Sequence, residues 1–304
     1  MRAAIYTKTK SGKILEIKEI DQPIPKHNEV VLRVRASSVN PLDWRMKSHR
    51  PGVDVAGEVL SVGQAITQFK PGDAVFGVCR GAFTEYASVS ESKLVAKPEH
   101  ISFDQAASIP VAGLTALQGL RDHGHLQSGQ KVLINGAAGG VGTFAVQIAK
   151  AFGARVTGVC SNKNVELVRS LGADRAIDYA REDFTQDTQR YDLILDNVGN
   201  RALSAMRRVM GENGRCVMVG APKTLGPVLA RLVQALTWSP FIKHKFRFFI
   251  AKIKQDDLLM LCELIQAGKL TPVIDRRYPL ADTASALAYV EQGHAPAKVI
   301  ITVE

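Results

Sequence analysis

The sequence predicts an α/β protein in which a partly closed β-barrel is combined with a doubly wound parallel sheet. Up to about residue 103, short runs rich in β-branched and aromatic residues alternate with Gly and Pro turns, a pattern typical of antiparallel strands. From Asp104 onward, helical and strand-like segments alternate, a pattern typical of parallel strands joined by helices. The length of 304 residues also fits about two domains.

The β-rich part contains three strand-like runs. They are expected at 29–39 (EVVLRVRASSV), 52–63 (GVDVAGEVLSVG) and 82–90 (AFTEYASVS). A turn at Pro71-Gly72-Asp73 separates two of them. Residues 298–303 (KVIITV) predict a further strand, which we expect to return to this part of the molecule.

The alternating part predicts one parallel sheet with helices on both faces. Helices are expected at 105–124, 142–154, 164–173, 202–210 and 256–268, and strands at 131–137, 155–161, 175–179, 191–198, 214–220 and 246–251. We therefore divide the chain into a β-rich domain at 1–112, completed by 271–304, and a doubly wound domain at 113–270.

The composition excludes disordered and fibrous proteins, because 46% of the residues are hydrophobic and 22% are charged, close to the globular average. The 39 Lys and Arg residues exceed the 29 Asp and Glu residues, and the net charge of +10 predicts attraction for anions. The four Cys residues form no CxxC motif or Cys/His cluster, so we expect neither a disulfide framework nor a structural zinc. The first residues lack the apolar stretch of a signal peptide, and we expect a cytoplasmic protein.

A glycine-rich turn, Gly136-Ala137-Ala138-Gly139-Gly140-Val141-Gly142, follows the strand at 131–137. Gly139 and Gly140 permit close approach of a pyrophosphate, and the following helix supplies free N–H groups and the positive end of its dipole. Ala137 occupies the first Gly position of the G-x-G-x-x-G fingerprint, so the turn is a variant. A tight turn alone would explain the glycines, but the flanking strand and helix favour a dinucleotide site.

The end of the next strand bears on the choice of cofactor. An NAD site usually carries an acid there, whereas this chain has Cys160-Ser161-Asn162-Lys163. We interpret Ser161 and Lys163 as ligands of a 2′-phosphate, which indicates NADPH. The alternative is an ordinary polar helix start, in which Ser161 or Asn162 caps the helix and Lys163 is solvated; both interpretations can hold together.

These motifs together resemble a known family. GAAGGVGTFAVQIAKAFGA, preceded by AASIPVAGLTALQGL and followed by LGADRAIDY and GKLTPVIDRRYPL, is similar to the zinc-free branch of the medium-chain dehydrogenase/reductase superfamily. The nearest members would be quinone oxidoreductases and zeta-crystallin-like proteins, and the resemblance covers nearly the whole chain. It implies a GroES-like catalytic domain, a Rossmann NADP-binding domain, hydride delivery from NADPH and a homodimer.

The resemblance also implies which residues bind the cofactor. Thr115 would lie near the nicotinamide end. The other matching positions are the pyrophosphate turn (Ala138, Gly139, Gly140, Val141), the 2′-phosphate pocket (Ser161, Lys163, Tyr179), the ribose and nicotinamide lining (Asn197, Val219, Gly220, Phe248, Phe249, Ile250) and the weaker match Lys298. For Tyr179 and Phe248, simple packing is the alternative.

No metal site is expected. Zinc-dependent relatives carry a catalytic Cys near the position of Asn40 and a His in a GHE-type motif, but SSVNPLDW and residues 52–57 contain neither. A Lewis-acid mechanism needs three ligands around an open position. The pair in His123-Gly124-His125 is interpreted as a solvated turn.

The simplest chemistry without a metal is hydride transfer to an electrophilic acceptor, a quinone or an α,β-unsaturated carbonyl. Asn40 is the candidate donor to the developing oxygen anion, with solvent as the proton source; the alternative is a turn former before Pro41. Trp44 would wall the acceptor pocket. Residues 45–50 form a shorter connection than in many family members, which predicts a more open pocket.

Two other functions stay open. An enoyl-thioester reductase would reduce the same conjugated system attached to CoA or a carrier protein. A non-catalytic NADPH-binding or membrane-peripheral protein is suggested by the short connection and by residues 225–254, where an apolar helical stripe precedes a basic run. For that segment, a helix covering the cleft or a dimer seam is the alternative. No recognised nucleic-acid-binding module is present, so nucleic acid is not an expected partner.

Overall fold

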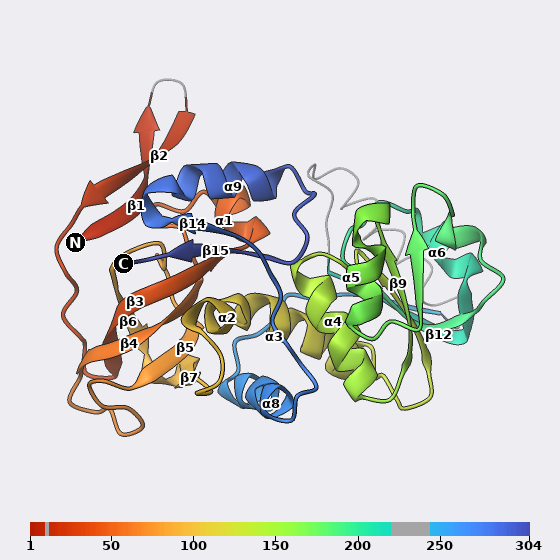
Figure 1. Cartoon of the computed structure of the whole chain (residues 1–304), viewed down its shortest axis with the longest axis horizontal. Helices are drawn as coiled ribbons and strands as arrows, with labels where there is room; N and C mark the ends of the chain where they lie inside the picture. Colours follow the sequence, from red (N-terminus) through yellow and green to blue (C-terminus); the bar gives the residue numbers. More distant parts are fainter. Residues whose placement is uncertain (10–11, 220–243) are drawn as a thin grey trace. The chain divides into compact units, whose positions relative to one another are not determined.

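The computed structural model describes residues 1–9, 12–219 and 244–304, and contacts divide the chain into two compact units (Figure 1). Unit 1 comprises Met1–Leu114, Ile253–Gln266 and Pro272–Glu304, and unit 2 comprises Thr115–Lys252 and Ala267–Thr271. Helix α8 (Gln255–Gln266) therefore groups with unit 1, whereas the sequence placed this segment with the doubly wound domain. The reason lies in its contacts: Gln255 Nε2 donates to Leu94 O at 2.7 Å, and Leu261 packs over Gly113.

The described part of unit 1 is built on a seven-stranded sheet in the order β14-β15-β3-β4-β5-β7, with β6 also paired to β3. The strands are β3 (Glu29–Val39), β4 (Asp54–Val62), β5 (Ala74–Val78), β6 (Tyr86–Ser90), β7 (Leu94–Ala96), β14 (Ile274–Pro279) and β15 (Lys298–Thr302). β1 (Arg2–Thr9) and β2 (Gly12–Glu19) form a separate antiparallel hairpin. β15 pairs antiparallel with β3, as the sequence predicted for this segment (blue beside orange in Figure 1).

The helices of unit 1 are α1 (Pro41–Met46), α2 (Phe103–Ser108), α8 and α9 (Thr283–Glu291), with 3₁₀ turns η1 (Glu91–Lys93) and η5 (Leu280–Asp282). Of these, α2, α8 and α9 contact strands of the sheet. Helix α3 (Pro110–Gln118) begins in unit 1 and continues into unit 2. The single helix expected at 105–124 is wrong, because Pro110 has no N–H to continue α2 and starts α3 instead. A π-helical turn, η2 (Gly119–His123), follows α3. Alternate residues of β3, such as Val30, Leu32 and Val34, enter the core with Leu287 of α9.

The described part of unit 2 contains a parallel six-stranded sheet in the order β10-β9-β8-β11-β12-β13. The strands are β8 (Lys131–Asn135), β9 (Arg155–Cys160), β10 (Arg175–Asp178), β11 (Tyr191–Asp196), β12 (Met210–Met218) and β13 (Lys245–Phe248). The helices are α4 (Gly140–Ala151), α5 (Val165–Ser170) and α6 (Leu203–Arg208), with 3₁₀ turns η3 (Asn162–Asn164) and η4 (Phe184–Gln186). Numbered from β8, this is the 3-2-1-4-5-6 order of the Rossmann fold.

Two glutamine side chains of unit 2 bond the backbone at Lys252 and Thr271, the last residues of its two chain segments. Gln118 bonds both backbone groups of Lys252: its Nε2 donates to Lys252 O at 2.7 Å and its Oε1 accepts from Lys252 N at 2.9 Å. Gln147 does the same to Thr271, at 3.0 and 2.8 Å. Each amide satisfies one donor and one acceptor that would otherwise lie unpaired in a partly buried position.

Replacement of Gln147 by Met should therefore destabilise the chain. The change keeps the volume of the side chain but leaves the Thr271 N–H and C=O without partners, at a cost of about 1–3 kcal/mol. Urea denaturation measures the loss, with Gln186→Met, an exposed glutamine on η4, as the control. Equal midpoints for the two variants would contradict the proposed role of Gln147.

Candidate active site

The turn between β8 and α4 has the shape of a dinucleotide cradle. Gly136 has a φ of +78°, which favours glycine, and a Cβ on Gly142 would lie 2.1 Å from Gly136 O. Gly139 is the N-cap of α4 with a φ of −75°, and a Cβ there would meet Gly136 O at 3.5 Å. A side chain would therefore clash with the backbone at Gly142, whereas the turn leaves open space at Gly139. The first N–H groups of α4, which begins there, lack intrahelical acceptors.

Asn197 lies beside this turn, at the carboxyl end of β11. A Cβ on Gly136 would meet Asn197 Cβ at 3.5 Å. In the described part of the chain, Nδ2 and Oδ1 of Asn197 are both buried without a hydrogen-bond partner. Buried amide atoms are usually paired, so this side chain offers one donor and one acceptor to a ligand. Val219, which follows β12, lies close by, because its N–H donates to Asp196 O at 3.0 Å.

The residues predicted for the 2′-phosphate lie at the carboxyl ends of β9 and β10. Ser161 follows β9, and its Oγ accepts from Asn164 Nδ2 at 3.1 Å. The Tyr179 N–H donates to Cys160 O at 3.1 Å, which places Tyr179 beside the start of this loop, and its ring is 49% exposed. The Lys163 side chain is exposed on η3. The three residues belong to two adjacent loops, and Lys163 and Tyr179 are exposed to solvent.

The remaining predicted cofactor ligands occupy varied positions. Thr115 is 8% exposed on α3, and Ile250 is 92% exposed after β13. Phe248 packs partly against the core of unit 2, and Phe249 stacks on His123 with ring centroids 4.3 Å apart. The prediction of a solvated turn at 123–125 is therefore wrong for His123, because its ring stacks on Phe249. Gly220 and the apolar stripe at 225–236 lie outside the described residues.

The residues of unit 2 fit a dinucleotide. The open position at Gly139, the unpaired amide of Asn197 and the Ser161, Lys163 and Tyr179 side chains all lie at the carboxyl ends of parallel strands, where the Rossmann fold binds its ligands. The N–H groups of α4 would hold the pyrophosphate, and Asn197 would bond the ribose or nicotinamide.

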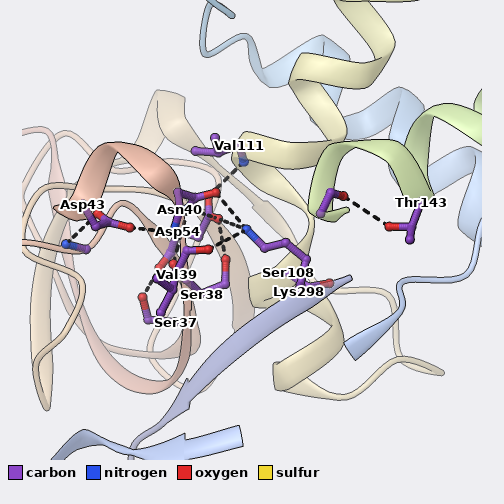
Figure 2. A network of polar contacts seen from close by, with 12 residues as sticks. Ser37, Ser38, Val39, Asn40, Asp43, Asp54, Ser108, Val111, Thr143 and Lys298 are labelled. Carbon is purple, nitrogen blue, oxygen red and sulfur yellow. Dashed lines mark hydrogen bonds and ion pairs between the residues drawn. The ribbon is translucent and has the colours of Figure 1, made fainter. Parts of the chain in front are cut away.

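Unit 1 contains a buried polar network centred on Asp54 (Figure 2). Asp54 Oδ2 accepts from Ser38 Oγ at 2.5 Å, from Asn40 Nδ2 at 2.8 Å and from Lys298 Nζ at 3.3 Å. Asp54 Oδ1 accepts from the Val111 N–H at 2.9 Å. The Asp54 and Lys298 side chains are 0% and 3% exposed. This burial requires all the oxygen lone pairs and ammonium protons to be satisfied within the protein.

Two residues predicted for different tasks meet in this network. Lys298, the weaker cofactor candidate, donates from Nζ to Asn40 Oδ1 at 2.8 Å, and Val39 O lies 3.4 Å from the same nitrogen. Asn40 Nδ2 donates to Asp54 and, at 3.3 Å, to Ser38 O. Both hydrogens of the Asn40 amide are therefore used inside unit 1. Donation to an acceptor oxygen would require exchange of the longer bond, the one to Ser38.

Asp43 adjoins the network from α1. Its carboxylate accepts from the Asn40 N–H at 2.8 Å and from the Gly52 N–H at 3.0 Å. Burial raises the pKa of Asp43 to about 7, with the nearby Asp54 charge acting in the same direction and the two N–H bonds opposing it. Because the folded chain then binds this proton more tightly than the unfolded chain, the contribution of Asp43 to stability falls as pH rises toward 7.

Trp44 and the short connection lie beside this region. The Trp44 ring packs on the core of unit 1, and the Arg45 guanidinium lies 5.1 Å from its centroid. Within the described residues Trp44 Nε1 is buried without a partner. The connection at 45–50 is held against β1, because the Tyr6 N–H donates to His49 O at 2.9 Å.

Sequence reasoning missed several residues that build these sites. Asp196 Oδ1 accepts from Asn135 Nδ2 at 2.9 Å and from the Gly199 N–H at 2.9 Å, which shapes the loop that carries Asn197. The signal was a polar residue at the end of each of two apolar strands. Ser38 and Asp54 carried no such signal, because their partners are distant in sequence.

In the ranges that the structure describes, no three His, Cys, Asp or Glu side chains gather where they could hold a metal ion.

Comparisons with known proteins agree with this architecture. Residues 26–99 match the model of the alcohol dehydrogenase GroES-like domain, and residues 171–301 match that of the zinc-binding dehydrogenase. The chloroplast envelope quinone oxidoreductase homolog of Arabidopsis thaliana is 34% identical over 314 residues, covering 94% of this chain and 93% of the plant protein. A chloroplastic NADPH-dependent alkenal/one oxidoreductase of the same plant is 32% identical over 99% of this chain and 79% of its own length. The quinone oxidoreductase structure from Coxiella burnetii superposes with a TM-score of 0.86 at 28% identity, over 100% of this chain and 99% of that one.

A catalytic β-barrel domain together with a Rossmann cradle defines an oxidoreductase that uses a nicotinamide cofactor. The chain belongs to the quinone oxidoreductase branch of the medium-chain dehydrogenase/reductase superfamily. The predicted family and fold class are thereby confirmed.

Two glycine substitutions should separate folding from cofactor binding. Gly142→Ala places a Cβ 2.1 Å from a backbone oxygen and should destabilise the chain by about 1–3 kcal/mol. Gly139→Ala fits the backbone but fills the open face of the cradle, so it should weaken NADPH binding about tenfold or more at nearly unchanged stability. Thermal unfolding and NADPH fluorescence titration measure the two effects. Wild-type NADPH affinity in Gly139→Ala would contradict the cradle.

Proposed function

We propose that this chain is an NADPH-dependent reductase that transfers a hydride to quinones or α,β-unsaturated carbonyls without zinc. The observation that carries the proposal is the loop pair after β9 and β10, where Ser161, Lys163 and Tyr179 accompany an open glycine cradle and no carboxylate follows β9. The acceptor class is supported by relatives named quinone oxidoreductase and alkenal/one oxidoreductase.

The residues of the chain would divide the work as follows. When bound, the nicotinamide supplies the hydride. The Lys163 ammonium and the Ser161 and Tyr179 hydroxyls would bind the 2′-phosphate, and the N–H groups at the start of α4 would bind the pyrophosphate. Because the acceptor is already electrophilic, the protein has to orient it and stabilise the negative charge that develops on its oxygen. Asn40 as the donor to that oxygen stays a prediction, with solvent as the proton source.

Removal of the Lys163 charge should change cofactor preference. Lys163→Ala should lower kcat/KM for NADPH about tenfold or more, because a charge-assisted contact to the 2′-phosphate is lost, while kcat/KM for NADH stays within about twofold. Steady-state kinetics with both cofactors measure the split. Arg155→Ala, which removes an exposed cation at the opposite end of β9, is the control. Equal losses with NADPH and NADH would refute the assignment of Lys163.

An acceptor screen tests the reaction itself. We expect NADPH to be consumed in the presence of 1,4-naphthoquinone or a 2-alkenal, because both acceptors need no acid or metal for activation. Crotonyl-CoA is included as the thioester arm, and NADPH fluorescence reports binding independently. Turnover confined to crotonyl-CoA would favour the enoyl-thioester reductase. Tight NADPH binding without turnover of any acceptor would favour the non-catalytic alternative.

Other expectations concern partners and location. In the described parts of the chain, every helix is too short or too polar to cross a membrane. The homodimer, a peripheral membrane contact through 225–254, the cytoplasmic location and the absence of a nucleic-acid partner stay predictions.

A further inference from the structure

Two features of the local structure adjoin the Asp54–Lys298 pair, and the first is the cap of α1. In the segment 40–43, Asn and Asp stand at the N-cap and third positions of α1, where the Asn side-chain oxygen normally accepts from the third N–H. Both halves of this box are present, and Asn40 Oδ1 in addition accepts from Lys298 Nζ at 2.8 Å. The cap residue of α1 is therefore also a ligand of the buried cation.

The second feature is backbone strain immediately before Lys298. Ala297 has a φ of +56°, a left-handed conformation that L residues with a Cβ adopt at a cost in free energy. Such strain persists where the surrounding structure holds the residue in place, and it gathers at functional positions. Here the strained residue delivers Lys298 to the start of β15, with its ammonium beside Asp54 and Asn40.

Stability alone does not account for the pair. A fully buried ion pair loses the hydration of both charges, and well-packed apolar residues in its place are often equally stable or more so. The hydrogen bonds around Asp54 instead link four elements: β3 through Ser38, α1 through Asn40, β15 through Lys298 and α3 through Val111. The pair therefore determines geometry more than it adds stability.

Two of these links lead to residues of the proposed reaction. The hydrogen bonds to Oδ1 and Nδ2 of Asn40 fix the plane of its amide. The amide hydrogen that points at Ser38 O is then the one that can be donated to an acceptor oxygen instead. The bond to the Val111 N–H fixes the first turn of α3, and the negative charge suits that end of the helix. Thr115 lies four residues further on, one turn along the same face of α3.

We propose that Asp54 and Lys298 are positioning residues of the reductase: together they fix the amide of Asn40 and the first turn of α3, and through them the geometry of hydride transfer. The inference rests on the proposed function for its catalytic readout. Its structural half, the control of α3 by Asp54 and Lys298, concerns the ligand-free chain alone.

The experiment compares Lys298→Met, Lys298→Arg and the double variant Asp54→Asn/Lys298→Met with wild type. Arg277→Met, which breaks an exposed ion pair with Asp104 in the same unit, is the control. Hydrogen exchange over residues 110–118 of the ligand-free chain reports the first turn of α3. Steady-state kinetics, NADPH fluorescence titration and the kinetic isotope effect with deuterated NADPH report the reaction, and thermal unfolding reports stability.

Lys298→Met should speed exchange in the first turn of α3 and lower kcat about tenfold to a hundredfold, because small misplacement of reacting groups costs this much. The isotope effect should rise, and NADPH affinity should stay within about twofold because the cradle lies in unit 2. Lys298→Arg should recover part of kcat. The double variant, which leaves no unpaired charge, should regain thermal stability but not kcat.

Recovery of both stability and kcat in the double variant would overturn the proposal, since the pair would then be purely structural. Unchanged exchange over 110–118 in Lys298→Met would overturn it as well. Absence of turnover in the wild-type chain would instead refute the proposed function, and the exchange comparison would still decide whether the pair controls α3.

Discussion

The burial of one carboxylate governs the construction of unit 1. A charge removed from water is tolerated only when its oxygens are fully bonded, and Asp54 meets this condition with donors that come from four separate elements. β4, which carries Asp54, must therefore keep one arrangement relative to the donor elements β3, α1, β15 and α3. The same requirement ties the cap residue Asn40 to Lys298 and accompanies the strained conformation of Ala297, so that a single constraint connects features that look unrelated in sequence.

The fold could be predicted where local pattern suffices. The alternation of apolar strands with helices and the glycine turn established the doubly wound sheet, because strand, turn and helix signals all lie within about 30 residues of one another. Prediction failed where Pro110 divides an apolar helical pattern, and it placed α8 in the wrong unit. The amphipathic stripe of α8 shows that the helix packs against another element. Which element this is follows only from the three-dimensional contacts of Gln255 and Leu261.

The candidate site likewise has one part that could be predicted from the sequence and one part that could not. The positions of the cradle and of Ser161, Lys163 and Tyr179 follow from strand ends that adjoin in a parallel sheet, so sequence order is enough to group them. The bond between Lys298 and Asp54 joins residues 244 positions apart. No periodicity or motif carries that pairing, and Lys298 was assigned to the cofactor because a resemblance was the only guide. Asn40 stays a prediction as the donor to the acceptor oxygen, and its partners in the Asp54 network were not foreseeable.

The position of β15 has a consequence for the order in which the molecule forms on the ribosome. β15 lies between β14 and β3 and brings Lys298 to Asp54, so unit 1 cannot complete its sheet until residue 302 has been synthesised. Unit 2 is finished earlier, at Thr271. During that interval Asp54 lacks its cation, and the contacts still to form have large sequence separation, which slows folding. Synthesis thus completes the chain segments of unit 2 before unit 1 can close its sheet, and Lys298 is the last residue of the Asp54 network to be added.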